Sequence, residues 1–305
     1  MSNNKDFKIK NGIQPKVYQE TLGTVSVAGS TATLDLSTGS VFDYTPTSNA
    51  QVKLTNPAAS GTASGATLLL GSEDSTGVGS TFSTTLYTGT GAAKTISNGL
   101  DLSTDGGLVW IKRRDSAGSY SLWDSGRGIS NWLSSDSTSA QVDYTTTAMV
   151  SFNTDGFTLG VDTVVNASAA SMVSWSFKKK TKFFDVVTWT GNGTAGRTIS
   201  HNLGTTVGCV MIKNTSNAEN WMVYHIGSGI DGQLNLNSNA AAVDESGQFN
   251  DTVPSSTVLT LGSNAEVNAN GQTYVAYLFA HDTDASSLIQ CGSLTDGGAG
   301  INLGW

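Results

Sequence analysis

Two segments of the chain, each about 100 residues long, match each other in order at a nearly constant offset. The match begins with Tyr87-Thr88-Gly89 and Trp189-Thr190-Gly191, which lie 102 residues apart. Later motifs keep an offset of 101 to 103: Thr95-Ile96-Ser97 with Thr198-Ile199-Ser200, Trp110-Ile111-Lys112 with Met211-Ile212-Lys213, Thr158-Leu159-Gly160 with Thr260-Leu261-Gly262, Val165-Asn166-Ala167 with Val267-Asn268-Ala269, and Val173, Trp175 and Phe177 with Val275, Tyr277 and Phe279. Such self-similarity predicts two copies of one structural unit. We place repeat 1 at residues 81–181 and repeat 2 at residues 182–284.

A third copy begins near the end of the sequence. Leu294-Thr295-Asp296-Gly297-Gly298, followed by Ile301-Asn302-Leu303-Gly304, resembles the opening of repeat 2. We therefore expect residues 285–305 to start a further repeat, and the natural protein to continue beyond Trp305.

Both repeats have the sequence pattern of strands. The chain holds 35 Gly and only 13% charged residues, with many Ser, Thr and Asn, a composition that disfavours helix interiors. Short strand-like runs recur between Gly, Asn and Ser, and Asn153–Gly156 and Asn268–Gly271 have the residues of tight hairpin turns. These features predict an all-β protein in which each repeat is a jelly-roll or lectin-like β-sandwich.

Alternation along the last strand of each repeat predicts which face is buried. Val173, Trp175 and Phe177 alternate with Ser174 and Ser176, which predicts one buried and one solvated face. In repeat 2 both faces are apolar, because Tyr274, Ala276 and Leu278 alternate with Val275, Tyr277 and Phe279. We expect the second face to be covered by the neighbouring repeat or by a second subunit.

The N-terminal part divides in two. Residues 1–16 are polar, and their bulky apolar side chains are Phe7, Ile9 and Ile13, so we expect this segment to be ordered by docking on a partner. Residues 17–80 form a small β-rich region with strand-like runs at 24–27, 32–36, 41–44, 51–54 and 66–70. Its few large apolar residues favour packing between several copies of the chain.

Charge and cysteine content narrow the partners. The formal net charge of −8 repels nucleic acid, and the basic run Lys178–Lys182 is expected to be a solvated connector between the repeats. Cys209 and Cys291 lack a Cys or His at metal-ligand spacing, so we expect free thiols and no metal. The sequence shows no signal peptide and no run of apolar residues long enough to span a bilayer, which predicts synthesis in a cytoplasm without membrane insertion.

The sequence offers little for catalysis. Glycan hydrolysis needs two carboxylates at a fixed separation, yet no glutamate has a counterpart in the other repeat, and Asp124 and Asp155 have no matching acid pair in repeat 2. His201, His225 and His281 are not accompanied by a nucleophile-elbow motif, and the glycine strings include no phosphate-binding loop. We expect no enzyme activity and no cofactor.

The motifs of repeat 1 carry a resemblance. Gly107–Lys112, Leu122–Gly128, Trp132–Ser135, Ser151–Gly160 and Val173–Lys178 occur in the order seen in a repeat domain of tail-fibre and other appendage proteins of marine phages, above all cyanophages. The run Val41–Thr47 and the run Leu54–Gly65 are also similar to N-terminal parts of phage fibres. The resemblance implies a homotrimeric virion protein that is held by its N-terminus on tail adaptor, tube or portal-proximal proteins and reaches toward the host.

Two alternatives stay open beside a tail fibre: a capsid-decorating or head-fibre protein, and a glycan depolymerase tailspike. Because sugars stack on aromatic rings and bind amides and charged groups, candidate contacts for a host surface polysaccharide are Asp124, Arg127, Asn131 and Trp132. Trp123 is expected in the core, and Trp132 either in the core or at a subunit interface. Virion docking is assigned to Phe7, Ile9 and Ile13.

Overall fold

The structure, a computed structural model, has two compact units, residues 1–75 and 76–305. It describes residues 25–28, 31–35, 41–44, 51–55, 67–70, 78–144, 147–283 and 288–292. The predicted docking residues Phe7, Ile9 and Ile13 lie outside the described residues. So does most of the predicted third repeat.

Five short strands lie among the residues of the first unit that the structure describes, which confirms the strand-like runs seen in the sequence. They are β1 (Val25–Ala28), β2 (Thr31–Asp35), β3 (Val41–Tyr44), β4 (Gln51–Thr55) and β5 (Thr67–Leu70). Strand β2 pairs antiparallel with β1 and parallel with β4, and β3 pairs parallel with β5.

Repeat 1 is built from two antiparallel sheets that enclose a core. The larger sheet has the order β11-β10-β9-β8-β14-β6, and the smaller has the order β12-β13-β7. A short 3-10 helix, η1 (Val78–Ser80), precedes the first strand, and α1 (Thr163–Asn166) precedes the last. The strands are β6 (Phe82–Thr88), β7 (Lys94–Ile96), β8 (Gly107–Arg113), β9 (Ser121–Asp124), β10 (Asn131–Ser134), β11 (Val142–Asp143), β12 (Met149–Asn153), β13 (Gly156–Leu159) and β14 (Ser171–Lys178).

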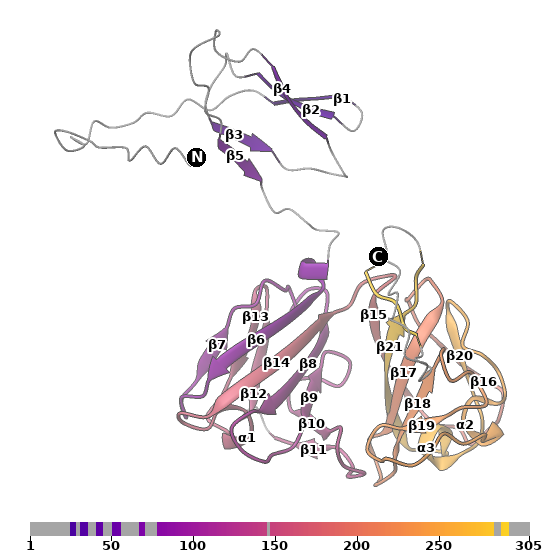
Figure 1. Ribbon diagram of the computed structural model, residues 1–305. Coiled ribbons are helices and arrows are strands. Elements are labelled where there is room, and N and C mark those ends of the chain that lie inside the picture. The colour runs from indigo at the N-terminus through magenta and orange to yellow at the C-terminus, as the bar shows by residue number, and fades with distance from the viewer. Residues whose placement is uncertain are drawn as a thin grey trace, which may run out of the picture. The chain divides into compact units, whose positions relative to one another are not determined.

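Repeat 2 has a five-stranded sheet, β15-β21-β17-β18-β19, and a two-stranded sheet, β16-β20. Of two short helices, α2 (Ser246–Phe249) contacts β20 of the smaller sheet, and α3 (Ala265–Asn268) contacts β17 and β18 of the larger sheet (Figure 1). The strands are β15 (Phe184–Thr190), β16 (Arg197–Ser200), β17 (Val207–Asn214), β18 (Trp221–His225), β19 (Leu234–Asn235), β20 (Val258–Leu261) and β21 (Thr273–Ala280). The protein is therefore all-β, as the composition predicts.

The large sheets of the two repeats share one strand register. A row of paired residues crosses the sheet of repeat 1 from β6 to β10, and an equivalent row crosses repeat 2 from β15 to β19. The first row is Thr84, Trp175, Trp110, Leu122 and Leu133. The second row is Val186, Tyr277, Met211, Val223 and Leu234. Residues that match in the sequence at offsets of 101 and 102 thus occupy equivalent positions in the two sheets.

The predicted orientation of strand β14 is wrong. Ser174 and Ser176 are fully buried, on the side of the strand that also carries the core residue Met172. Asn98 donates a hydrogen bond to the Ser176 hydroxyl (3.0 Å), which satisfies one of these buried groups. Trp175 and Phe177 lie on the opposite face and are only half-buried. The serines face the core because the outer face of this sheet is itself an interface, where large apolar side chains are needed.

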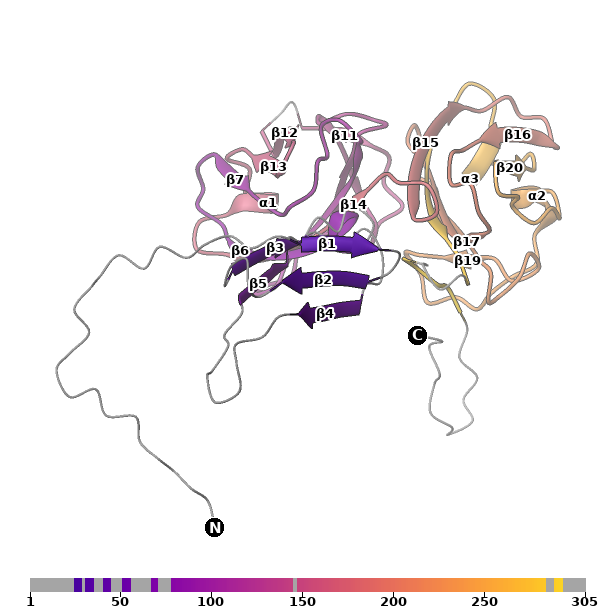
Figure 2. The ribbon, with the colours of Figure 1, turned by 90° about the horizontal axis from the view of Figure 1, so that it is seen from above.

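The outer faces of the two large sheets pack against each other. Leu108, Leu122 and Leu133 of repeat 1 form one hydrophobic cluster with residues of repeat 2. The repeat 2 members are Phe183, Phe184, Val186, Met211, Trp221, Val223, Val275, Tyr277 and Phe279. The second apolar face of β21 is thus covered by the neighbouring repeat, one of the two expected covers, and Figure 2 shows the two sandwiches side by side. The face inside repeat 2 is the one that carries Tyr274, Ala276 and Leu278.

One of the two predicted hairpin turns is present. Asn153 pairs with Gly156 across a two-residue loop between β12 and β13, and Gly156 has the positive φ of 106° that favours glycine. Asn268–Gly271 does not join two strands. It connects the end of α3 to β21, and Gly271 supplies a positive φ there.

Candidate functional site: the cleft between the two repeats

A buried ion pair and a tyrosine join the repeats. The Nε of Arg127 lies 2.6 Å from Oδ2 of Asp124, and the side chains are 4% and 0% exposed. Tyr277 of repeat 2 donates a hydrogen bond to the same carboxylate oxygen (2.7 Å) and accepts one from Nη2 of Arg127 (3.1 Å). An ion pair inside repeat 1 is therefore hydrogen-bonded to a tyrosine of repeat 2, and we call Asp124, Arg127 and Tyr277 the clamp.

All five N–H groups of the Arg127 guanidinium have acceptors. Besides Asp124 and Tyr277, they donate to the backbone oxygen of Asn131 (2.9 Å), the amide oxygen of Gln141 (3.1 Å) and the backbone oxygen of Leu122 (3.4 Å). Burial is the largest single effect on the pKa of Arg127 and lowers it, but the charge of Asp124 acts together with Tyr277 and the hydrogen bonds to both residues, and the combined result is a raised pKa. Burial likewise raises the pKa of Tyr277 well above its ordinary value, so this hydroxyl stays protonated.

The four predicted polysaccharide contacts have different positions. Asp124 is fully buried and Arg127 is saturated, so neither offers a group to a ligand, and their role is to hold the repeats together. Asn131 lines the cleft described below, with its side chain hydrogen-bonded to Gln141 (2.7 Å) and to the backbone oxygen of Arg127. Trp132 packs on the core of repeat 1, the first of its two expected places, and Trp123 is in that core as predicted.

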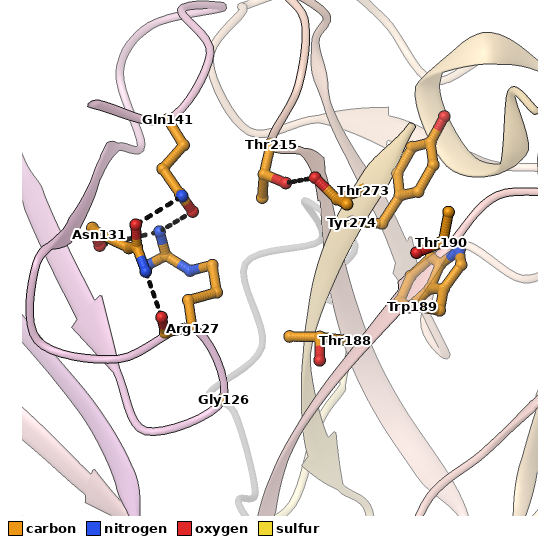
Figure 3. A pocket seen from close by; sticks show the side chains of 10 residues that line it. All are labelled: Gly126, Arg127, Asn131, Gln141, Thr188, Trp189, Thr190, Thr215, Thr273 and Tyr274. Atoms are coloured by element: carbon orange, nitrogen blue, oxygen red, sulfur yellow. Dashed lines mark hydrogen bonds between the residues drawn. The ribbon is translucent and has the colours of Figure 1, made fainter. Parts of the chain in front are cut away.

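A cleft of about 400 Å³ lies beside the clamp, between the repeats. Arg127, Asn131 and Gln141 lie on the side of repeat 1, and threonines from β15, from β21 and from the position just after β17 lie opposite them (Figure 3). The complete lining is Gly126, Arg127, Asn131, Gln141, Thr188, Trp189, Thr190, Thr215, Thr273 and Tyr274. Clefts of this size at a junction between domains are a common place for ligand binding.

Close contacts between the repeats set the shape of the cleft. The backbone N–H of Gln141 donates to the backbone oxygen of Thr215 (3.0 Å). At the other side, Gly126 passes so close to β15 that an added Cβ would lie 3.0 Å from the Val186 side chain. Away from the cleft, the indole N–H of Trp221 donates to the backbone oxygen of Ser134 (2.9 Å), which closes the interface there.

The polar groups that the cleft presents are neutral. Thr188, Thr190 and Thr273 are exposed, and the hydroxyls of Thr215 and Thr273 are hydrogen-bonded to each other (2.6 Å). Trp189 and Tyr274 stack on each other with ring centroids 5.4 Å apart, but both are buried and leave little ring surface for stacking on a ligand. Hydroxyl and amide groups of this kind suit a neutral, polyhydroxylated ligand better than an anion.

The threonines were not predicted as site residues. They alternate with Trp189 and Tyr274 along β15 and β21, a pattern that indicates a half-buried strand and carries no further signal. They become part of a site because Asn131 and Gln141, about 50 to 140 residues earlier in the chain, lie opposite them.

Residues 78–298 match the model of a protein family described as a domain of unknown function, DUF7483. The matched segment is more than half of the chain. The chain belongs to the DUF7483 family. The match spans both sandwiches, the clamp and the cleft, so the DUF7483 domain in this chain comprises the joined pair. No curated protein and no solved structure matches the chain.

The acidic residues considered for glycan hydrolysis have structural contacts in the DUF7483 domain. Asp124 belongs to the clamp, and Asp155 accepts a hydrogen bond from the backbone N–H of Gly99 (2.7 Å) in the neighbouring turn. Among the residues that the structure describes, no three His, Cys, Asp or Glu side chains lie close enough to hold a metal ion. None of the helices described is long and apolar enough to cross a membrane.

The three histidines lie apart from the cleft lining. His201 is buried, and burial lowers its pKa. Burial also lowers the pKa of His225, whose Nδ1 accepts a hydrogen bond from the backbone of Gly227 (3.0 Å). His281 Nδ1 accepts one from the backbone of Cys291 (3.1 Å). Each of these contacts is to the backbone.

Cys209 and Cys291 are free thiols, as predicted, and both are half-buried. Burial raises the pKa of Cys209 to about 12, with a smaller contribution from the nearby Cys291. A thiol with so high a pKa is a poor nucleophile at neutral pH.

The basic run at the junction is paired with acids. Lys178 lies 3.1 Å from Asp105, Lys179 lies 3.0 Å from the buried Asp185, and Lys182 lies 3.4 Å from Asp282. The segment connects the two sandwiches, as expected, and the ion pair of Lys179 with Asp185 joins a residue of repeat 1 to a residue of repeat 2.

Lys213, beside the cleft residue Thr215, supplies a pH-dependent contribution to stability. Its buried ammonium donates to the backbone oxygens of Asn214 (2.8 Å) and Asn217 (3.3 Å). Burial lowers the pKa of Lys213 from 10.5 to about 8, against the opposing charges of Glu219 and Glu266. The unfolded chain therefore binds more protons than the folded chain between pH 8 and pH 10.5, and the contribution of this group to stability rises with pH in that window.

We predict that the free energy of unfolding of the unsubstituted protein increases relative to that of Lys213→Met as the pH rises from below 8 toward 10. Urea unfolding at a series of pH values measures it. Other titrating groups, including the buried tyrosines, are common to both proteins and cancel in the difference. A difference that stays constant with pH would contradict the lowered pKa.

Proposed function

We propose that the protein is a non-enzymatic structural component of a phage virion, most simply the N-terminal part of a tail fibre. Residues 1–16 dock on the tail, and the two sandwiches extend from that attachment toward the host surface. The observation that supports this best is the joining of the repeats by a shared apolar cluster and a buried ion pair. A junction of this kind suits a part that must keep its two modules in one orientation under load.

The ordered motifs of repeat 1 supply the second support, because they resemble those of phage appendage proteins. Two alternatives are a capsid-decorating or head-fibre protein and a glycan depolymerase tailspike. The structural contacts of Asp124 and Asp155 give no support to the depolymerase.

Labelling of virus particles tests the proposal. Gold-labelled antibodies raised against the two repeats should mark a few sites at one end of the particle, where the tail is. Label spread over the shell would favour the capsid-decorating alternative, and unlabelled particles from a producing culture would reject a virion protein. Deleting residues 1–16 should abolish incorporation while the repeats stay folded, so retained incorporation would argue against docking through Phe7, Ile9 and Ile13.

We further propose the cleft as the place where a host surface polysaccharide is bound. Thr188 and Thr190 of repeat 2 lie on one side of its open space, and Asn131 and Gln141 of repeat 1 lie on the other side (Figure 3). Thr188→Trp should fill that space and abolish binding on a glycan array, whereas Thr198→Trp, at an exposed strand position outside the cleft, should leave binding unchanged. Equal binding by both variants would reject the cleft as the site.

A further inference from the structure

Part of the outer face of the large sheet is exposed in repeat 1, whereas the equivalent part in repeat 2 is covered. In repeat 2, Val186, Tyr277 and Met211 are 4%, 0% and 5% exposed because repeat 1 packs on them. The equivalent residues of repeat 1 are Thr84, Trp175 and Trp110. Thr84 is exposed and the two tryptophans are only half-buried.

The next row of the sheet shows the same contrast at two positions. Lys213 and Trp221 are fully buried in repeat 2. At the matching positions of repeat 1, Lys112 is half-buried and lies over the ring of Tyr120, 4.0 Å from its centroid, and Tyr120 is 37% exposed.

The edge of this row differs between the repeats in residue type and not in exposure. Leu86 is 61% exposed, the most exposed large apolar residue among those described, and its counterpart in repeat 2 is the exposed Thr188 of the cleft. Between the edge and Lys112, Val173 is buried, as its counterpart Val275 is in repeat 2.

These residues form the open face of repeat 1, defined by Thr84, Leu86, Trp110, Tyr120 and Trp175. It is continuous with the established interface, because one row of paired residues runs from Thr84 through both tryptophans to the buried Leu122. Trp110 itself packs against the shared apolar cluster. The open face thus extends an interface that already joins two sandwiches.

We propose that the open face of repeat 1 is a self-association surface that is covered by a second copy of this chain. The equivalent face of repeat 2 is covered by a sandwich of the same kind, repeat 1. A sandwich from a second copy of the chain therefore has the apolar surface needed to cover the open face. Enrichment in tryptophan, tyrosine and leucine with few charges is the composition of an interface core. The inference deepens the proposed function, since an appendage built of several copies needs contacts between them.

The mass of the full chain in solution tests the proposal. Sedimentation velocity and light scattering over a wide range of concentration should give a multiple of 31.6 kDa. Leu86→Glu and Thr84→Glu place a charge within the surface without disturbing a core, so each should return the mass to 31.6 kDa. Val253→Glu is the matched control, because Val253 is similarly exposed (57%) but lies in a loop of repeat 2. It should keep the larger mass, and the thermal midpoints of all variants should agree.

Three results would overturn the inference. They are a monomeric unsubstituted chain at every concentration, an oligomer that both glutamate variants retain, and an oligomer that the control loses as well. None of these results would affect the labelling of particles, so failure of this surface and failure of the virion proposal are distinguishable.

Discussion

Replacing Arg127 with methionine is expected to lower the free energy of unfolding of the two-repeat unit by about 3–5 kcal/mol. The change removes the guanidinium that neutralises Asp124. It leaves a carboxylate that is 0% exposed with two neutral donors, the Tyr277 hydroxyl and the backbone N–H of residue 127. An unpaired buried charge costs far more than the pair itself contributes. Urea unfolding followed by tryptophan fluorescence measures the effect, because six of the seven tryptophans lie in the repeats.

Arg113→Met is the matched control for this substitution. The Nε of Arg113 lies at the same 2.6 Å from a carboxylate oxygen of Asp115, but the side chains are 34% and 35% exposed. Water screens such a pair, so the urea midpoint should stay unchanged. Equal losses from both arginines would show that burial is not the cause.

The triple variant Arg127→Met, Asp124→Leu and Tyr277→Phe should recover most of the lost stability. It removes the buried charge together with both groups that bind it, and apolar replacement of a buried ion pair is often neutral or stabilising. A triple variant as unstable as Arg127→Met would mean that packing around the guanidinium stem, and not the charge on Asp124, carries the effect.

Replacing Asn166 with aspartate is expected to cost about 2–4 kcal/mol, although the side chain keeps its size. Asn166 is fully buried in repeat 1. Its amide donates to the backbone oxygens of Gly160 (2.7 Å) and Ala92 (2.5 Å), and its oxygen accepts from the backbone of Thr90 (2.8 Å). Aspartate keeps the acceptor but removes both donors and places a negative charge against two carbonyl oxygens.

Asn268 makes the equivalent contacts in repeat 2, donating to the backbone oxygens of Gly262 (3.0 Å) and Thr194 (2.9 Å). We therefore expect Asn268→Asp to cost about as much as Asn166→Asp, on the same basis of two lost buried donors. Asn202→Asp is the control, since Asn202 is exposed and only its backbone N–H bonds to another residue. Urea unfolding measures all three, and an unchanged midpoint for either buried variant would contradict the assigned role.

These two asparagines show what could be predicted from the sequence alone and what could not. Their place in matching Val-Asn-Ala motifs shows that they occupy equivalent positions, and the structure gives them equivalent bonds. Their function as ties between three backbone segments was not predicted, because Thr90 and Ala92 lie more than 70 residues away in the chain. A contact between residues so far apart in the chain produces no local sequence pattern.

The candidate site was predicted less well than the fold. Two of its four predicted residues, Asp124 and Arg127, proved to be interior, because residue types that bind a ligand at the surface also satisfy each other when buried. The cleft threonines lie on ordinary strands, and only the packing of the two repeats places them opposite Asn131 and Gln141.

By itself the sequence determined that the chain is all-β, where most strands lie, and that two segments share one strand register, because alternation and self-similarity are local or periodic signals. Only the tertiary structure decided which face of each large sheet is inside its sandwich. Alternation separates the two faces of a strand without saying what each one meets. When both faces are covered, the face with the larger apolar side chains can belong to the interface, and Ser174 and Ser176 then lie in the core.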